Sequence, residues 1–342
     1  MKIKVFCTLG PASLHDDVIR GLDERGVDLL RINLSHTAPG VLEETIEKVE
    51  AVSSTPICLD TQGPQVRCGR MAPDVTLREG ADVRLTGEPV IGTDREISLW
   101  PDSVFGALAP ESLVSVDFDG AVLRVVDVEA GSARAVVTSA GRVGANKAVT
   151  IDPAPELPGL TAQDVAAIGV GAARGIMYYA LSFAGSAGHV ASIRELAPAG
   201  AHVISKIESR AGVRNMDAII EASDSILIDR GDLSRELPLE YVPYYQKAIV
   251  RRANRWSTPV YVATNLLESM ITNQRPNVAE ADDIANTLLD GVHGLVLAAE
   301  TAVGRNPLGA VDMVRRAIAA FESAGAHQLL AEDRALSSPA PR

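Results

Sequence analysis

A lysine and a glutamate stand two residues apart at the end of an apolar run. The run reads HVISKIE, residues 202–208, and it ends with Lys206 and Glu208 flanking an isoleucine. Because side chains alternate between the two faces of a strand, these two side chains lie on the same face. A salt bridge at a strand end is the ordinary interpretation of an isolated pair of this kind. The alternative is a ligand-binding pair, and the rest of the sequence has to decide between the two.

Other strand-like runs also end in polar residues. The polar residues at four further run ends are Arg31, Asn33 and Ser35, then Asp60 and Thr61, then Gly231 and Asp232, and finally Thr264. If these ends meet at one edge of a sheet, so many polar groups would be costly to remove from water unless they bind something. The sequence therefore favours one binding site over a set of separate salt bridges.

The residue types indicate a site for a small phosphorylated carboxylic acid. Glu208 and Asp232 offer carboxylate oxygens, which are the ligands that Mg²⁺ prefers. Lys206 and Arg31 could hold a phosphate beside that metal ion. Gly231 begins a predicted loop that leads to a helix, and its backbone N–H could receive a carboxylate.

The elements that must position these residues alternate between strands and helices. Eight apolar, β-branched runs, each followed by helix-like sequence, occupy residues 3–8, 28–33, 56–61, 175–183, 202–208, 225–230, 259–264 and 294–300. This alternation predicts an α/β fold, a (β/α)8 TIM barrel, in which the chemistry lies at the carboxyl ends of the strands. We expect the barrel to take residues 1–69 and 156–325.

One interval breaks the alternation. Residues 70–155 hold only short alternating runs separated by turn signals, which predicts a small all-β domain inserted after barrel strand 3. The chain returns through the proline-rich segment PAPELPGL (153–160), so we expect this domain to act as a hinged lid over the barrel mouth. Residues 326–342, which end in SSPAPR, are predicted to form a tail.

Composition narrows the class of partner. The chain has 342 residues and a formal net charge of −12, and it carries no basic block, so we expect no nucleic-acid partner. It has three cysteines and no C-x-x-C motif, which is typical of core residues in a reducing cytoplasm. No run is long and apolar enough to span a bilayer, and the first residues do not resemble a signal peptide, so we expect a cytoplasmic location and no membrane partner.

Several motifs in this order resemble the pyruvate kinase family. They are CTLGPAS (7–13), LLRINLSH (29–36), LDTQGPQVR (59–67), VDFDG (116–120), LPGLTAQD (157–164), ISKIES (204–209), RGDL (230–233), VATNLLESMI (262–271) and LDGVHGLVLAAETAVGRNP (289–307). The resemblance covers about residues 3–320, and several of the motifs are specific in combination. The family has a barrel with a small β-domain inserted at this point.

The resemblance implies Mg²⁺- or Mn²⁺-dependent phosphoryl transfer between phosphoenolpyruvate or pyruvate and a nucleotide, with ADP as the first expectation. Glu208 and Asp232 would be the divalent-metal ligands, and Lys206 would stabilise the phosphoryl group in flight. Arg31 would contact the phosphate, and the substrate carboxylate would be held by Gly231, Asp232 and Thr264, with Thr264 also near the enolate. A monovalent cation such as K⁺ would be bound by Asn33, Ser35, Asp60 and Thr61. The nucleotide would be contacted by His36, Arg67 and Lys147.

The sequence also departs from the family pattern. The family's D-T-K-G-P-E is here D-T-Q-G-P-Q, and the second altered position, Gln65, is the one linked to potassium dependence. The family's A-R-G-D-L-G begins here with Asp229 instead of alanine. Other altered positions are Gln62, Gly185, Ser234, Asn265, Leu266, Asn277 and Val278.

The departures leave several functions open. A minimal pyruvate kinase, a related enzyme with another acceptor or acid substrate, a metal-dependent pyruvate aldolase on the same barrel, and a non-catalytic paralogue all remain. The presence of Lys206 favours phosphoryl chemistry. The family's carboxy-terminal α/β domain, which supplies one of two subunit interfaces, does not occur in this sequence, so we expect a homodimer rather than the family's tetramer.

Overall fold

The structure is a computed structural model that describes residues 2–117 and 120–323. The predicted tail at 326–342 and two residues of the VDFDG motif, 118–119, lie outside the described residues. The chain divides into two compact units, which are Met1–Gly63 with Gly159–Arg342, and Pro64–Pro158.

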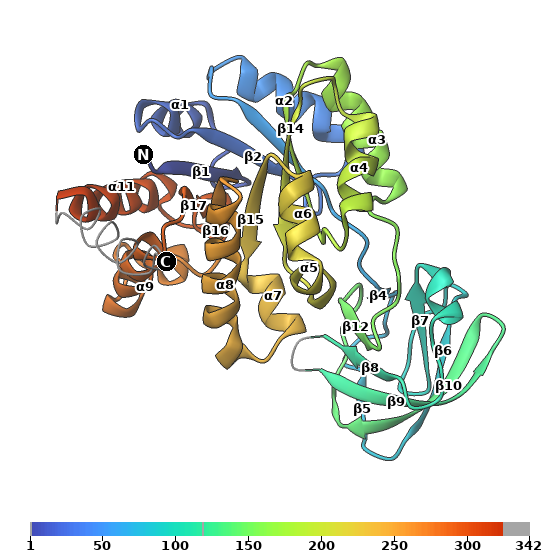
Figure 1. Ribbon diagram of the computed structural model, residues 1–342. Coiled ribbons are helices and arrows are strands. Elements are labelled where there is room, and N and C mark those ends of the chain that lie inside the picture. Colours follow the sequence, from blue (N-terminus) through green and yellow to red (C-terminus); the bar gives the residue numbers. More distant parts are fainter. Residues whose placement is uncertain (1, 118–119, 324–342) are drawn as a thin grey trace, which may run out of the picture. The chain divides into compact units, whose positions relative to one another are not determined.

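The first unit is built on a closed barrel of eight parallel strands (Figure 1). The strands are β1 (Lys4–Leu9), β2 (Leu29–Asn33), β3 (Ile57–Asp60), β13 (Tyr178–Leu181), β14 (His202–Ile207), β15 (Ser225–Asp229), β16 (Val260–Ala263) and β17 (Gly294–Leu297). Consecutive barrel strands pair, and β1 closes the ring by pairing with β17. This confirms the predicted barrel with a second, separate sheet between β3 and β13.

Helices surround the strands of the barrel (Figure 1). They are α1 (Asp16–Glu24), α2 (Leu42–Glu50), α3 (Ala162–Ala173), α4 (Ala187–Leu196), α5 (Arg210–Arg214), α6 (Met216–Ala222), α7 (Arg230–Glu236), α8 (Val242–Arg255), α9 (Val278–Leu289), α10 (Ala299–Ala302) and α11 (Pro307–Ser323). Short 3₁₀ turns occur at η1 (Pro39–Val41), η3 (Leu239–Tyr241) and η4 (Glu268–Ile271). Within the described residues, every helix falls short of the length or the apolar character that a bilayer span would need.

The first unit has two apolar layers, one inside the barrel and one between the strands and the helices. The inner layer is Phe6, Leu29, Cys58, Ala180, Ile204, Leu227, Tyr261, Ala263 and Val296, with Tyr178 packed against it. A much larger cluster, which includes Ile19 of α1 and Val250 of α8, lies between the strands and the helices. Strand alternation assigns each residue to one layer or the other. Burial raises the pKa of the Cys7 and Cys58 thiols, as expected for unreactive core cysteines.

A buried carboxylate joins the chain segments where the first unit is interrupted. Asp164 accepts hydrogen bonds from the backbone N–H groups of Gln62 and Gly63, at 2.7 and 3.2 Å. It also accepts from the backbone and hydroxyl of Thr161, which caps α3 in return. Gly63 has a φ of +71°, and a Cβ there would lie 2.8 Å from Ser182, so glycine is required at this position.

The second unit is an all-β body with its own core. Its strands are β4 (Arg67–Cys68), β5 (Thr76–Leu77), β6 (Asp82–Thr86), β7 (Glu96–Trp100), β8 (Leu113–Val116), β9 (Ala121–Glu129), β10 (Ser132–Ser139), β11 (Gly141–Arg142) and β12 (Val149–Asp152), with a 3₁₀ turn at η2 (Asp102–Gly106). Seven strands form one sheet in the order β12-β8-β9-β10-β6-β7-β4, and β11 pairs with β5. A hydrophobic cluster that includes Leu85, Leu99 and Leu123 fills it.

Candidate active site

The polar and charged side chains of the site lie on the inward face of the barrel strands, beyond the inner apolar layer. On β14, Ile204 belongs to the inner apolar layer, and alternation then turns Lys206 and Glu208 to the same side. On β15, the inner residue Leu227 is followed two positions later by Asp229. The same two-residue step leads from Phe6 to Thr8 on β1, from Leu29 to Arg31 on β2 and from Cys58 to Asp60 on β3. It also leads from Ala180 on β13 to Ser182, just after that strand. A polar layer therefore follows the apolar layer at the carboxyl ends of the strands.

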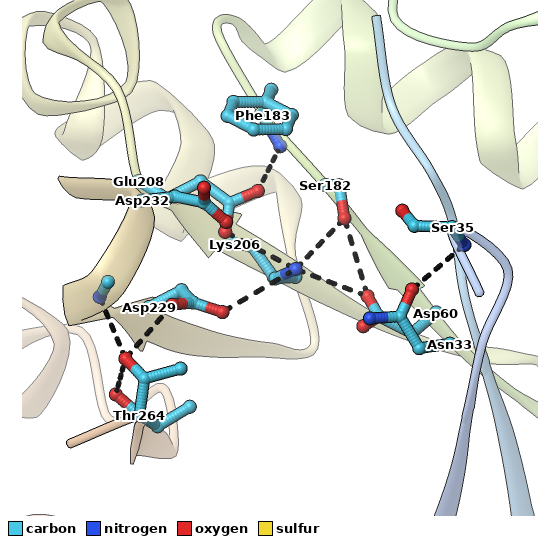
Figure 2. A network of polar contacts seen from close by, with 12 residues as sticks. Asn33, Ser35, Asp60, Ser182, Phe183, Lys206, Glu208, Asp229, Asp232 and Thr264 are labelled. Carbon is cyan, nitrogen blue, oxygen red and sulfur yellow. Dashed lines mark hydrogen bonds and ion pairs between the residues drawn. The ribbon is translucent and has the colours of Figure 1, made fainter. Parts of the chain in front are cut away.

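Lys206 is the centre of this polar layer (Figure 2). Its ammonium lies 3.4 Å from Asp60, 3.3 Å from Glu208 and 3.8 Å from Asp229, and it donates a hydrogen bond of 3.0 Å to Ser182 Oγ. The residue is only 5% exposed. Burial disfavours the charged form, but the surrounding carboxylates outweigh it and raise the pKa of Lys206 above its ordinary value. The lysine is therefore a fixed, buried positive charge.

Arg31 provides a second buried positive charge in the same layer. Its Nε donates to the Thr8 hydroxyl at 2.9 Å, and its Nη1 lies 3.0 Å from Asp60 Oδ2. That contact is an ion pair, and neither of its two atoms makes a hydrogen bond. Burial opposes the charge, yet Asp60 and Asp229 raise the pKa of Arg31. The guanidinium is thus held in place with a donor still available for a ligand.

Three carboxylates form an acidic cluster beside the lysine. Glu208, Asp229 and Asp232 each place one oxygen so that these atoms lie within 4.8 Å of one another. Glu208 is fully buried; its Oε1 accepts from the backbone N–H of Phe183 at 2.7 Å, while its Oε2 has no hydrogen-bond partner. Burial raises the pKa of Glu208 well above its usual range, despite Lys206, and burial together with Asp229 raises the pKa of Asp232.

These properties fit a hard divalent cation. Three carboxylate oxygens at this spacing match the ligand type that Mg²⁺ and Mn²⁺ prefer. The buried Oε2 of Glu208 makes no hydrogen bond and has an ion pair of 3.3 Å with a shared lysine, so a cation would satisfy it more fully. The raised pKa values have the same cause, since buried carboxylates crowd together without enough positive charge.

Thr264 and the start of α7 complete this side of the site. Thr264 has a φ of +67°, and its Oγ1 accepts a hydrogen bond of 2.7 Å from the backbone N–H of Gly231. The hydroxyl in turn lies 3.0 Å from Asp229 Oδ1 and 2.6 Å from the carbonyl of Ala263. The guanidinium of Arg230 donates to the Thr264 carbonyl and fixes this loop.

The expectation of a loop at Gly231–Asp232 was wrong. The helix α7 begins at Arg230, directly after β15, so both residues lie in its first turn. The free N–H groups of a first helical turn need acceptors, and the Thr264 hydroxyl fills this role for Gly231. A substrate carboxylate at Gly231 would have to take the place of this hydroxyl.

The residues expected to bind a monovalent cation lie on adjacent strands. Asn33 of β2 is the register partner of Asp60 of β3, and the Asn33 side chain accepts from the backbone N–H of Ser35 at 2.9 Å. The Thr61 hydroxyl accepts from the backbone N–H of Ser182 at 2.9 Å. Asp60 faces both Arg31 and Lys206, so much of its charge is already balanced by these cations.

The residues expected to contact the nucleotide are divided between the two units. His36 is exposed in the first unit. Arg67 and Lys147 are in the second unit, where Arg67 donates to Gln65 at 2.6 Å and to the Asn146 carbonyl at 3.1 Å, and Lys147 forms an ion pair of 2.9 Å with Asp117. Arg67 and Lys147 lie on neighbouring segments, since Arg67 forms an isolated antiparallel β-bridge with Ala148, the residue after Lys147.

Asp229 and Ser182 belong to the polar layer but were not among the residues predicted from the sequence. In the sequence, Asp229 stands out only as a replacement of the family's alanine. The signal that could have found both is the two-residue step from an inner apolar residue, from Leu227 to Asp229 and from Ala180 to Ser182. This step becomes usable only when the inner face of each strand is known.

The fold and the site define a (β/α)8 barrel that carries buried cations and an acidic, metal-type cluster at the carboxyl ends of its strands. The model of the family described as "Pyruvate kinase, barrel domain" matches residues 1–311. The chain belongs to the pyruvate kinase family.

Several curated relatives share this family. A protein named pyruvate kinase from Geobacillus stearothermophilus is 35% identical over 98% of this chain and 60% of its own length. A pyruvate kinase from Mycobacterium tuberculosis (strain CDC 1551 / Oshkosh) is 37% identical over 93% of this chain and 70% of its own length. A pyruvate kinase from Methylorubrum extorquens is 36% identical over 92% of this chain and 67% of its own length. The chain therefore spans 60–70% of the length of these relatives.

Proposed function

We propose that this chain catalyses phosphoryl transfer between phosphoenolpyruvate and a nucleoside diphosphate, ADP in the first place, to give pyruvate. The observation that carries the proposal is the buried ammonium of Lys206 beside the acidic cluster of Glu208, Asp229 and Asp232. The relatives named pyruvate kinase support it. An aldolase or a binding protein has no comparable need for this buried ammonium.

The roles of the side chains follow from charge and position. Lys206 would neutralise the phosphoryl oxygens as the bond to the enolate breaks, since its positive charge is already fixed before substrate arrives. Arg31 would hold the phosphate through its Nη1, which makes an ion pair with Asp60 and no hydrogen bond. The Thr264 hydroxyl, which accepts from the Gly231 N–H of α7, would contact the carboxylate end of the substrate or the enolate carbon.

A divalent cation, Mg²⁺ or Mn²⁺, would be held by Glu208 and Asp232. When bound, such an ion supplies positive charge to the phosphoryl and enolate oxygens and orients them. Two contacts support this role for Glu208: the Phe183 N–H fixes one of its oxygens, and the other oxygen makes no hydrogen bond and only an ion pair with Lys206. We further propose that Asn33, Ser35, Asp60 and Thr61 bind a monovalent cation such as K⁺, and that His36, Arg67 and Lys147 contact the nucleotide.

One assay tests the proposed reaction directly. Pyruvate release from phosphoenolpyruvate should be measured with Mg²⁺ and each nucleoside diphosphate in turn, with and without K⁺. Release that depends on a diphosphate, together with formation of the triphosphate, supports the proposal. Cleavage of 4-hydroxy-2-oxo acids without any phosphoryl transfer from phosphoenolpyruvate would show an aldolase instead.

We propose that residues 70–155 act as a mobile lid on this reaction. The second unit has its own hydrophobic core and joins the first unit through two chain crossings, at Gly63–Pro64 and Pro158–Gly159, so it can move as a body. A lid that expels water would protect the phosphoryl group from hydrolysis. Metal and phosphoenolpyruvate together should therefore slow hydrogen exchange around residues 62–69 and 153–161. Unchanged exchange at saturating ligand would show that the domain does not close.

We also propose a homodimer in the cytoplasm. The helices α8 and α9 are adjacent, since Gln246 donates to Thr287, and apolar side chains on and beside them are exposed, including Tyr244 at 71% and Val278 at 86%. A second copy of the chain could cover these groups, and twofold dimers are the commonest assembly. Light scattering should give a mass of about two chains, and a mass of one or four chains would contradict the proposal. The three cysteines, all free and buried, agree with a reducing compartment.

A further inference from the structure

We propose that Asp229 is a third carboxylate ligand of the divalent cation, so that this chain binds the metal tightly before substrate arrives. The inference rests on the proposed function, in which Glu208 and Asp232 hold that cation. It concerns a residue that stands where the family pattern has alanine, and it therefore describes a property of this chain rather than of the family.

The position of Asp229 supports this role. Its carboxylate lies within 4.8 Å of the ligand oxygens of both Glu208 and Asp232. Figure 2 shows it beside these two side chains and pointing toward Lys206. Asp229 is only 5% exposed, so water cannot satisfy its oxygens easily. A buried carboxylate of this kind has to find cationic or hydrogen-bonding partners within the protein.

The partners of Asp229 in the first unit leave its charge incompletely balanced. Its Oδ2 lies 3.8 Å from the Lys206 ammonium, which is shared with Asp60 and Glu208 at shorter distances. Its Oδ1 faces the Thr264 hydroxyl at 3.0 Å, but that hydroxyl has one proton and a shorter contact of 2.6 Å with the Ala263 carbonyl. Neither contact occupies the Asp229 oxygens fully.

An independent observation points to a ligand at the same place. Glu208 is fully buried, and its Oε1 is fixed by the Phe183 N–H. Its Oε2 makes no hydrogen bond, and its ion pair of 3.3 Å is with the Lys206 ammonium, which Asp60 and Asp229 share. A cation between Glu208, Asp229 and Asp232 would satisfy this oxygen and the incompletely balanced carboxylate together. Oxygen ligands for a hard cation are then supplied from the residue after β14, from the end of β15 and from the first turn of α7.

The charges explain why binding should precede substrate. The layer holds four carboxylates, those of Asp60, Glu208, Asp229 and Asp232, against two buried cations, Lys206 and Arg31. A third cation, the half-exposed Arg235, pairs with Asp232 at 3.0 Å from outside the layer, so negative charge still exceeds positive charge. With alanine at position 229, one negative charge fewer would attract the ion, and oxygens of phosphoenolpyruvate would have to compensate. The third carboxylate should therefore raise metal affinity in the absence of substrate and reduce the effect of substrate on that affinity.

The test measures Mn²⁺ affinity in the absence of phosphoenolpyruvate, by electron paramagnetic resonance and by calorimetry. The Asp229→Ala variant should bind Mn²⁺ about tenfold to a hundredfold more weakly than the wild type. Saturating phosphoenolpyruvate should recover most of this loss, because substrate oxygens replace the missing carboxylate. The Asp229→Asn variant keeps the size of the side chain and an oxygen near Thr264, and it should also bind Mn²⁺ more weakly. This second variant keeps the test valid if the alanine variant does not fold.

Two reference variants make the result decisive. Asp283→Asn removes a carboxylate that pairs with Arg230 and lies outside the acidic cluster, and it should leave Mn²⁺ affinity within about twofold of the wild type. If Glu208→Gln loses Mn²⁺ while Asp229→Ala and Asp229→Asn do not, Asp229 is not a ligand, and the proposed metal site still stands. If none of these variants loses Mn²⁺, the metal assignment itself is wrong and this inference is wrong with it.

Discussion

Replacing Lys206 with methionine should lower turnover by about 10²–10³, equivalent to roughly 3–4 kcal/mol of transition-state stabilisation. The ammonium faces Asp60, Glu208 and Asp229 at 3.3–3.8 Å and cannot move away as charge develops. Its contribution is therefore largest when the phosphoryl group is between the enolate and the acceptor. Binding of phosphoenolpyruvate should weaken much less, because in the proposed site Arg31 would still contact the phosphate.

A second reaction separates this role from a purely structural one. The Lys206→Met variant should still exchange the methyl protons of pyruvate, since forming the enolate does not need this ammonium. Steady-state kinetics and proton exchange followed by NMR measure the two steps on the same sample. Lys247→Met serves as a control, because Lys247 pairs with Asp290 at the outside of the barrel and should leave both steps unchanged. Equal loss of both reactions in Lys206→Met would show that the lysine supports the site as a whole.

The Glu208→Gln variant should lower Mn²⁺ affinity about a hundredfold or more. Glutamine keeps the size of the side chain and an oxygen for the Phe183 N–H, but it removes the charge that faces Asp232 and Lys206. Because a hard cation requires charged oxygen ligands, the neutral amide should not replace the carboxylate. The Glu208→Gln, Asp232→Asn double variant should show no measurable Mn²⁺ binding by electron paramagnetic resonance.

The fold of these variants can be checked independently of metal. Neutralising Glu208 removes a buried carboxylate whose pKa is already raised by burial, so thermal unfolding in the presence of a chelator should show little loss of stability. Added Mn²⁺ should raise the unfolding temperature of the wild type and not that of the double variant. Tight Mn²⁺ binding by a well-folded double variant would remove Glu208 and Asp232 from the metal site.

The order of strands and helices could be predicted from the sequence because it depends on local periodicity. Apolar runs such as 202–208 and 225–230 became β14 and β15, and the amphipathic stretches between strands became helices. The small β-structure between β3 and β13 was also visible, because short alternating runs and turns interrupt the pattern. The polar ends of the runs then placed Arg31, Lys206 and Glu208 at one rim, since parallel barrel strands end on the same side.

The sequence was less informative where a position depends on neighbouring elements. The loop expected at Gly231 is the first turn of α7, because its N–H finds an acceptor in Thr264, which is distant in sequence. Asp229 looked like an incidental replacement of alanine. Its place in the acidic cluster becomes visible only when alternation from Leu227 and the closure of the barrel bring it beside Glu208.

The sequence by itself thus determined the barrel, the inserted β-structure and the identity of most polar groups at the strand ends. Only the tertiary structure decided how these groups are paired, for example that Lys206 is shared among three carboxylates and that one oxygen of Glu208 makes no hydrogen bond. The physical reason is that periodicity is a property of a single segment. The charge balance and hydrogen bonding of a buried group instead depend on distances between strands that only the closed barrel sets.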